Sequence, residues 1–141
     1  MSLKQANRPE GPNRSHEMFN LFSSLMGGGA AVDPAEAVQA VADKRALVID
    51  VREEAETREG RAKGALLLPL SRLHLAADPS SGHHDKRLAA AKKAGTPIYV
   101  YCASGARSGR AAMMLGNYGY ETVQNLGHLG NWQRGGGQVI R

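Results

Sequence analysis

Short apolar runs alternate with helix-forming segments along most of this chain, and this alternation most constrains its fold. Four runs are too short to be helices and are typical of buried strands. They span residues 46–51, 65–68, 97–101 and 122–126. Strands that alternate with helices at this spacing usually pair in parallel, with the helices packed against the sheet. The pattern predicts an α/β domain with a mainly parallel sheet.

Helices are predicted where caps and apolar spacing coincide. Asp33 is an N-cap residue, and Pro34 suits the first helical position. Gly95 and Gly119 are expected to end two later helices. The predicted helices cover residues 34–43, 53–59, 71–76, 86–93, 108–118 and 129–134.

The first 29 residues are expected to form a separate arm. Residues 1–17 are polar and interrupted by proline and glycine, whereas residues 17–26 have the apolar spacing of a short amphipathic helix. Ten residues are marginal as an isolated helix, so this segment should pack on the domain or on a partner. The domain itself is expected over residues 33–139.

Length and composition exclude several classes of protein. With 141 residues the chain has room for one domain, and its single cysteine excludes an internal disulfide or a multi-cysteine zinc site. No cofactor and no metal are expected. The net charge of +5 comes without a dense Lys/Arg block, so nucleic acid is not the expected partner. No apolar run is long enough for a membrane helix and no signal peptide is apparent, which predicts a soluble, cytoplasmic protein.

Chemistry is expected at the junction that follows the third predicted strand. The segment from Tyr99 to Arg110 reads YVYCASGARSGR, so a strand delivers Cys102 to the carboxyl edge of the sheet, where open α/β sheets bind ligands. A loop of small residues and one arginine follows, and the next helix should begin at about Ser108. The candidate anion-binding residues are Ala103, Ser104, Gly105, Ala106, Arg107 and Ser108.

Two features of this loop favour a thiolate at Cys102. Small residues allow backbone N–H groups to converge on the sulfur, and the helix N-terminus adds partial positive charge. Arg107 supplies a permanent cation. Both should lower the pKa of the thiol and populate its nucleophilic form.

The chain resembles the single-domain rhodanese family of sulfurtransferases over residues 33–139. Four matching pieces occur in the family's order: LVIDVRE at 47–53, GRAKGALLLPL at 60–70, YVYCASGARS at 99–108 and GNYGYETVQNLGHLGNW at 116–132. The resemblance implies a rhodanese-like α/β fold with a sheet of about five strands flanked by helices on both faces.

The resemblance also implies a function. Cys102 would accept sulfane sulfur as a persulfide from an anionic donor, such as thiosulfate or another persulfide, and pass it to a thiol, cyanide or a protein acceptor. The backbone amides of the loop would hold the persulfide, and Arg107 would help to bind the donor. Asp50 and Arg52 match the family's DVR positions, where we expect them to orient loops beside the site.

The chain departs from the family pattern in two places. The family's usual GHIPGA is GRAKGA here, so Arg61 replaces a histidine and Lys63 a proline. The usual double glycine near the end is Gly127 and His128. We expect a small shift in helix packing there.

Two other functions are weighed against sulfur transfer. Phosphatases and arsenate reductases on related folds place five residues between cysteine and arginine, whereas four separate Cys102 from Arg107. No aspartate adjoins the loop in the sequence to act as general acid. The other alternative is a non-catalytic rhodanese-like binding module, which normally lacks the cysteine.

Overall fold

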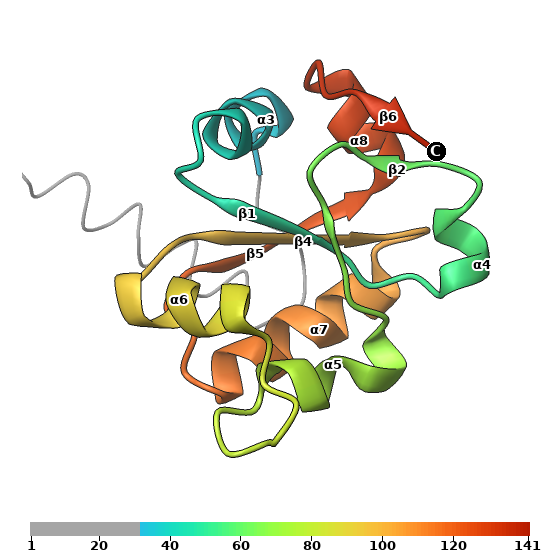
Figure 1. Ribbon diagram of the computed structural model, residues 1–141. Helices are drawn as coiled ribbons and strands as arrows, with labels where there is room; N and C mark the ends of the chain where they lie inside the picture. Colours follow the sequence, from blue (N-terminus) through green and yellow to red (C-terminus); the bar gives the residue numbers. More distant parts are fainter. Residues whose placement is uncertain (1–31) are drawn as a thin grey trace, which may run out of the picture.

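The structure is a computed structural model that describes residues 32–141 (Figure 1). Its main sheet has four parallel strands in the order β3-β1-β4-β5. These strands are β1 (Leu47–Asp50), β3 (Leu66–Leu67), β4 (Ile98–Cys102) and β5 (Val123–His128). The helices are α3 (Pro34–Ala42), α4 (Glu54–Thr57), α5 (Leu70–Ala77), α6 (Lys86–Ala94), α7 (Ala106–Asn117) and α8 (Leu129–Arg134). The helix predicted over residues 17–26 lies outside the described residues.

The sheet is covered by helices on both faces, which confirms the predicted rhodanese-like α/β fold. In Figure 1, α5, α6 and α7 lie below the sheet, whereas α3 and α8 lie above it. Side chains of β4 alternate between the two cores: Ile98 and Val100 pack with the lower helices, and Tyr99 and Tyr101 with the upper ones. Every residue of β4 is buried, as expected for a central parallel strand.

The local signals that predicted the helices are present as hydrogen bonds and backbone angles. The side chain of Asp33 accepts a hydrogen bond from the amide of Ala35 and begins α3. Asp85 caps α6 in the same way, and Gly95 ends that helix in the left-handed region at φ 70°. None of the helices in residues 32–141 combines the length and the hydropathy that a membrane crossing requires.

The strand count differs slightly from the expected sheet of about five strands. The main sheet has four, and a separate antiparallel pair is formed by β2 (Arg61–Ala62) and β6 (Val139–Ile140). Each strand of this pair has two residues, which is too short for a period-two pattern to appear in the sequence. The pairing is fixed by contacts between segments distant in the sequence, so local patterns could not reveal it.

A buried polar network joins this small sheet to the main one. Arg52 donates to both carboxylate oxygens of Asp50 and to the carbonyl of Gly60, the last at 2.6 Å. The hydroxyl of Tyr101 donates to Asp50 at 2.6 Å and accepts from the amide of Ala62 at 2.9 Å. Asp50 is completely buried and Arg52 nearly so, and a buried ion pair is tolerated when its remaining polar atoms have partners. The network therefore fixes the position of residues 60–62 against β1 and β4.

The hydroxyl of Tyr101 should contribute measurably to stability. Tyr101→Phe leaves the buried amide of Ala62 without its acceptor and removes a donor from Asp50. We expect the free energy of unfolding to fall by about 1 to 3 kcal/mol, measured by urea denaturation. Tyr118→Phe is the matched control, because within the described residues the Tyr118 hydroxyl makes no hydrogen bond; its change should stay within about 0.5 kcal/mol. Equal stability of the Tyr101 variant and the parent would contradict the role of the network.

Candidate active site

Cys102 lies at the carboxyl edge of the sheet, as predicted, but it is the last residue of β4, so the strand ends one residue later than predicted. Its side chain is completely buried. Three loop residues follow before α7 begins at Ala106, two residues before the predicted start at Ser108. Ala103, Ser104 and Ala106 are exposed, so the sulfur lies beneath a loop that is open to solvent.

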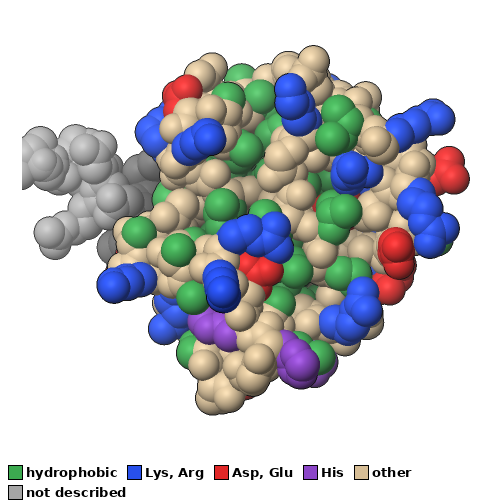
Figure 2. All heavy atoms as spheres, in the orientation of Figure 1, with side chains coloured by type: hydrophobic (Ala, Val, Ile, Leu, Met, Phe, Trp, Pro, Cys, Tyr) green, Lys and Arg blue, Asp and Glu red, His purple; other side chains and the backbone are tan. Residues whose placement is uncertain are grey.

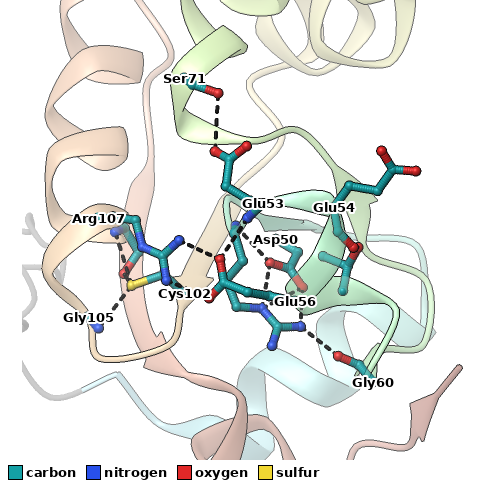
Figure 3. Close-up of polar contacts among 12 residues, drawn as sticks. Asp50, Glu53, Glu54, Glu56, Gly60, Ser71, Cys102, Gly105 and Arg107 are labelled. Carbon is teal, nitrogen blue, oxygen red and sulfur yellow. Dashed lines mark hydrogen bonds and ion pairs between the residues drawn. The ribbon is translucent and has the colours of Figure 1, made fainter.

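Backbone amides converge on the sulfur of Cys102 (Figure 3). The amide of Gly105 donates to Sγ at 3.0 Å, and the amide of Ser108 does so at 3.4 Å. The hydroxyl of Ser108 is also 3.4 Å from Sγ. Burial by itself raises the pKa of the thiol, but the hydrogen bonds from Ser108, Ser104 and Gly105 outweigh burial and hold the pKa below its usual value. The site therefore favours a thiolate.

The turn that aims these amides depends on Gly105. Its φ of 99° lies in the left-handed region, which favours glycine, and a Cβ at this position would meet the backbone of Gly127 at 3.6 Å. Asn125 on β5 then fixes the turn: its side-chain nitrogen donates to the carbonyl of Gly105 at 3.0 Å, while its side-chain oxygen accepts from the hydroxyl of Ser108 at 2.7 Å. Asn125 on β5 thus holds the turn at both Gly105 and Ser108.

Arg107 is held by an acidic side chain from another element. Its two terminal nitrogens donate to the two carboxylate oxygens of Glu56 on α4, at 2.7 and 2.8 Å (Figure 3). Hydrogen bonds from Arg107, and then from the amide of Glu53, lower the pKa of Glu56 to about 2. The sequence predicted that no aspartate adjoins the loop as a general acid; the carboxylate that lies beside it belongs to a glutamate on another element. Glu56 is ionised at neutral pH, so it cannot serve as the general acid that a phosphatase needs.

Asp50 ends β1 and Arg52 follows it, and β1 is a direct neighbour of β4, the strand that carries Cys102. Asp50 and Arg52 make the buried ion pair described above, which leaves both carboxylate oxygens of Asp50 hydrogen-bonded. In the part of the chain that the structure describes, no group of three His, Cys, Asp or Glu side chains is arranged to hold a metal ion.

The sequence also matches a known protein family. Residues 33–134 match the rhodanese-like domain family, which is most of the chain. The chain belongs to the rhodanese-like family. Membership agrees with the parallel sheet, the helices on both faces and the strand-to-helix loop that carries Cys102.

Three curated relatives are similar to this rhodanese-like chain. An uncharacterized Bacillus subtilis protein, YqhL, is 33% identical over 68% of this chain and 65% of its own length. A putative mitochondrial thiosulfate sulfurtransferase of Schizosaccharomyces pombe is 32% identical over 64% of this chain and 63% of its own length. A sulfurtransferase of Allochromatium vinosum is 30% identical over 77% of this chain and 92% of its own length. The chain thus spans slightly less than two thirds of the first two relatives.

Solved structures share the rhodanese-like fold. A human single-domain sulfurtransferase superposes with a TM-score of 0.58 at 27% identity, covering 75% of this chain and 97% of that one. A Rhodopseudomonas palustris protein described as a possible tyrosine phosphatase superposes with a TM-score of 0.67 at 21% identity, covering 99% of this chain and 100% of that one. At that identity the second likeness shows the fold alone.

Sequence reasoning missed two residues of this rhodanese-like site, Glu56 and Asn125. Glu56 lies on the helix that follows β1 and Asn125 lies within β5; these are the two strands that flank β4, so the parallel topology was a usable signal for both residues. Neither has a distinctive local motif. Glu56 is one of four glutamates between residues 53 and 59, and only the fold shows which of them reaches Arg107.

The thiol of Cys102 should ionise at lower pH than an ordinary cysteine. We expect the rate of alkylation by iodoacetamide to rise with pH through an inflection below 9.0, the reference pKa of the group. The hydroxyl of Ser108 lowers the pKa of Cys102 when its proton turns from Asn125 to the thiolate, so Ser108→Ala should move the inflection upward. Ser80→Ala, a change in an exposed loop, should leave it unchanged. An inflection at or above 9.0 in the parent protein would show that burial outweighs the hydrogen bonds.

Proposed function

We propose that this rhodanese-like protein is a sulfurtransferase that carries sulfane sulfur as a persulfide on Cys102. The observation that carries the proposal is the buried sulfur at 3.0 Å from the amide of Gly105 and 3.4 Å from that of Ser108, at the start of α7. Amides in this arrangement stabilise negative charge on a sulfur without a metal. Relatives named as sulfurtransferases support the same activity.

The first step loads the sulfur. With thiosulfate as donor, the Cys102 thiolate attacks the outer sulfur of the donor and forms a new S–S bond. The S–S bond of thiosulfate breaks, its electron pair leaves with sulfite, and the negative charge stays on the outer sulfur of the persulfide. The amides that donate to the Cys102 sulfur, those of Gly105 and Ser108, lie beside this charge, and the guanidinium of Arg107, paired with Glu56, lies at the mouth of the loop.

The second step unloads it. A thiol, cyanide or a thiolate on another protein attacks the outer sulfur and breaks the S–S bond, and the electron pair returns to Cys102 as thiolate. No cofactor is needed for either step. Asp50 and Arg52 act by holding residues 60–62 in place rather than by touching the reacting atoms.

The competing functions are less well supported by the site. Four residues separate Cys102 from Arg107, and the amides of this short loop point at the sulfur itself rather than around a larger tetrahedral group. Glu56 is bound to Arg107 and ionised. A binding module without catalysis does not account for a thiol whose pKa is lowered by the loop.

Intact mass spectrometry tests the covalent step. After brief incubation with thiosulfate the protein should gain one sulfur, about 32 Da, and subsequent cyanide should remove it. Cys102→Ser, which keeps the size of the side chain, should gain nothing.

Two results would contradict the proposal. One is a gain of the same mass by the serine variant. The other is failure of the parent protein to load from thiosulfate or from an alkyl persulfide while its thiol remains reactive to alkylation.

A further inference from the structure

The Glu56 carboxylate lies at the mouth of the Cys102 loop and neutralises the cation there. Both of its oxygens accept hydrogen bonds from Arg107, at 2.7 and 2.8 Å, and the pair is about two-thirds buried. Arg107 precedes Ser108, whose amide contacts the sulfur. Figure 3 shows the guanidinium of Arg107 between the sulfur and the carboxylate. An anion that approaches Cys102 therefore meets a cation whose charge is already balanced.

The position of Glu56 is fixed rather than adjustable. Its Oε2 also accepts the amide of Glu53 at 3.0 Å, which ties the carboxylate to the first turn of α4. The Glu53 side chain in turn accepts a hydrogen bond from Ser71 at the start of α5. Because the Glu56 carboxylate accepts hydrogen bonds both from the start of α4 and from α7, it can move away from the loop only by breaking them.

The neutral Arg107–Glu56 pair contrasts with the basic surface around it. Lys and Arg side chains outnumber Asp and Glu on the face in Figure 2, and the whole chain carries a net charge of +5. Such a surface attracts anions at long range. The acid beside the loop opposes that attraction only at the last few ångströms, where the charge of the bound donor matters most.

We propose that Glu56 selects the sulfur donor by charge, disfavouring the dianion thiosulfate relative to alkyl persulfides that carry a single charge or none. The inference rests on the proposed sulfur transfer and names the donor class that the site prefers. Thiosulfate brings two negative charges beside a carboxylate, whereas an uncharged alkyl chain on a persulfide brings none beyond the sulfur itself. The amides of Gly105 and Ser108 donate to the sulfur of Cys102 itself, and this contact is the same whichever donor loads the site.

The two loading reactions balance in the same way. With an alkyl persulfide, the Cys102 thiolate attacks the terminal sulfur and the S–S bond of the donor breaks. Its electron pair leaves with the alkyl thiolate, and the proton of the donor stays on the new persulfide. The reactions differ in the leaving group, which is dianionic sulfite in one and a monoanionic thiolate in the other. Only the first places a second charge near Glu56.

The test measures a ratio of donors within each variant. We use Glu56→Gln, which keeps an oxygen to accept from Arg107 but loses the charge, and compare kcat/KM for thiosulfate with that for 2-hydroxyethyl persulfide. The ratio of thiosulfate to persulfide should rise about tenfold or more, with most of the gain in KM for thiosulfate. The control is Glu54→Gln on the same helix, whose side chain is largely exposed and pairs with Arg58; its ratio should match the parent.

A second variant separates charge from fit. Glu56→Asp keeps the negative charge and shortens the side chain, so its donor ratio should stay close to that of the parent. A ratio that rises equally in the Asp and Gln variants would overturn selection by charge, and so would an unchanged ratio in Glu56→Gln. Because the ratio is internal to each variant, partial loss of folded protein does not affect it. If the parent protein loads sulfur from neither donor, the proposed function itself fails.

Discussion

The site depends on the hydrogen bonds between backbone amides and the buried sulfur of Cys102. Burial opposes ionisation of a thiol, and hydrogen bonds from the side chain and amide of Ser108 and from the amides of Ser104 and Gly105 overcome that opposition with dipoles rather than with a charged side chain. Such dipoles need no reorganisation when negative charge appears on the sulfur. The requirement explains why a glycine occupies the left-handed position in the turn and why Asn125 holds its carbonyl.

Polar contacts between neighbouring elements hold the surroundings of this turn together. Asp50, Arg52 and Tyr101 join β1 and β4 to the small antiparallel sheet, and Glu56 joins α4 to α7 across the same edge. Both networks start from the segment that directly follows β1. A single stretch of sequence therefore supports the core beneath the site and sets the charge at its mouth.

Much of the fold could be predicted because its signals are local. The caps at Asp33 and Asp85, the glycine at 95 and the apolar run before Cys102 each depend on a few neighbouring residues, and the structure contains the elements they predict. The pairing of β2 with β6 depends on contacts across nearly eighty residues of sequence, and neither strand lies in an apolar run like the one that predicted β3. The partner of Arg107 was missed for the same reason, since four nearby glutamates are equivalent until α4 is placed against α7.

The depth of Cys102 beneath an exposed loop has a consequence for which sulfur of a persulfide can react. The side chain of Cys102 is completely buried, whereas the loop residues Ala103, Ser104 and Ala106 that follow it are exposed. Attack at the inner sulfur would produce a mixed disulfide and release the sulfane sulfur as sulfide. A nucleophile at the inner sulfur would have to approach opposite the S–S bond, from the protein side where Cys102 is enclosed, so in the proposed mechanism the fold favours attack at the outer sulfur.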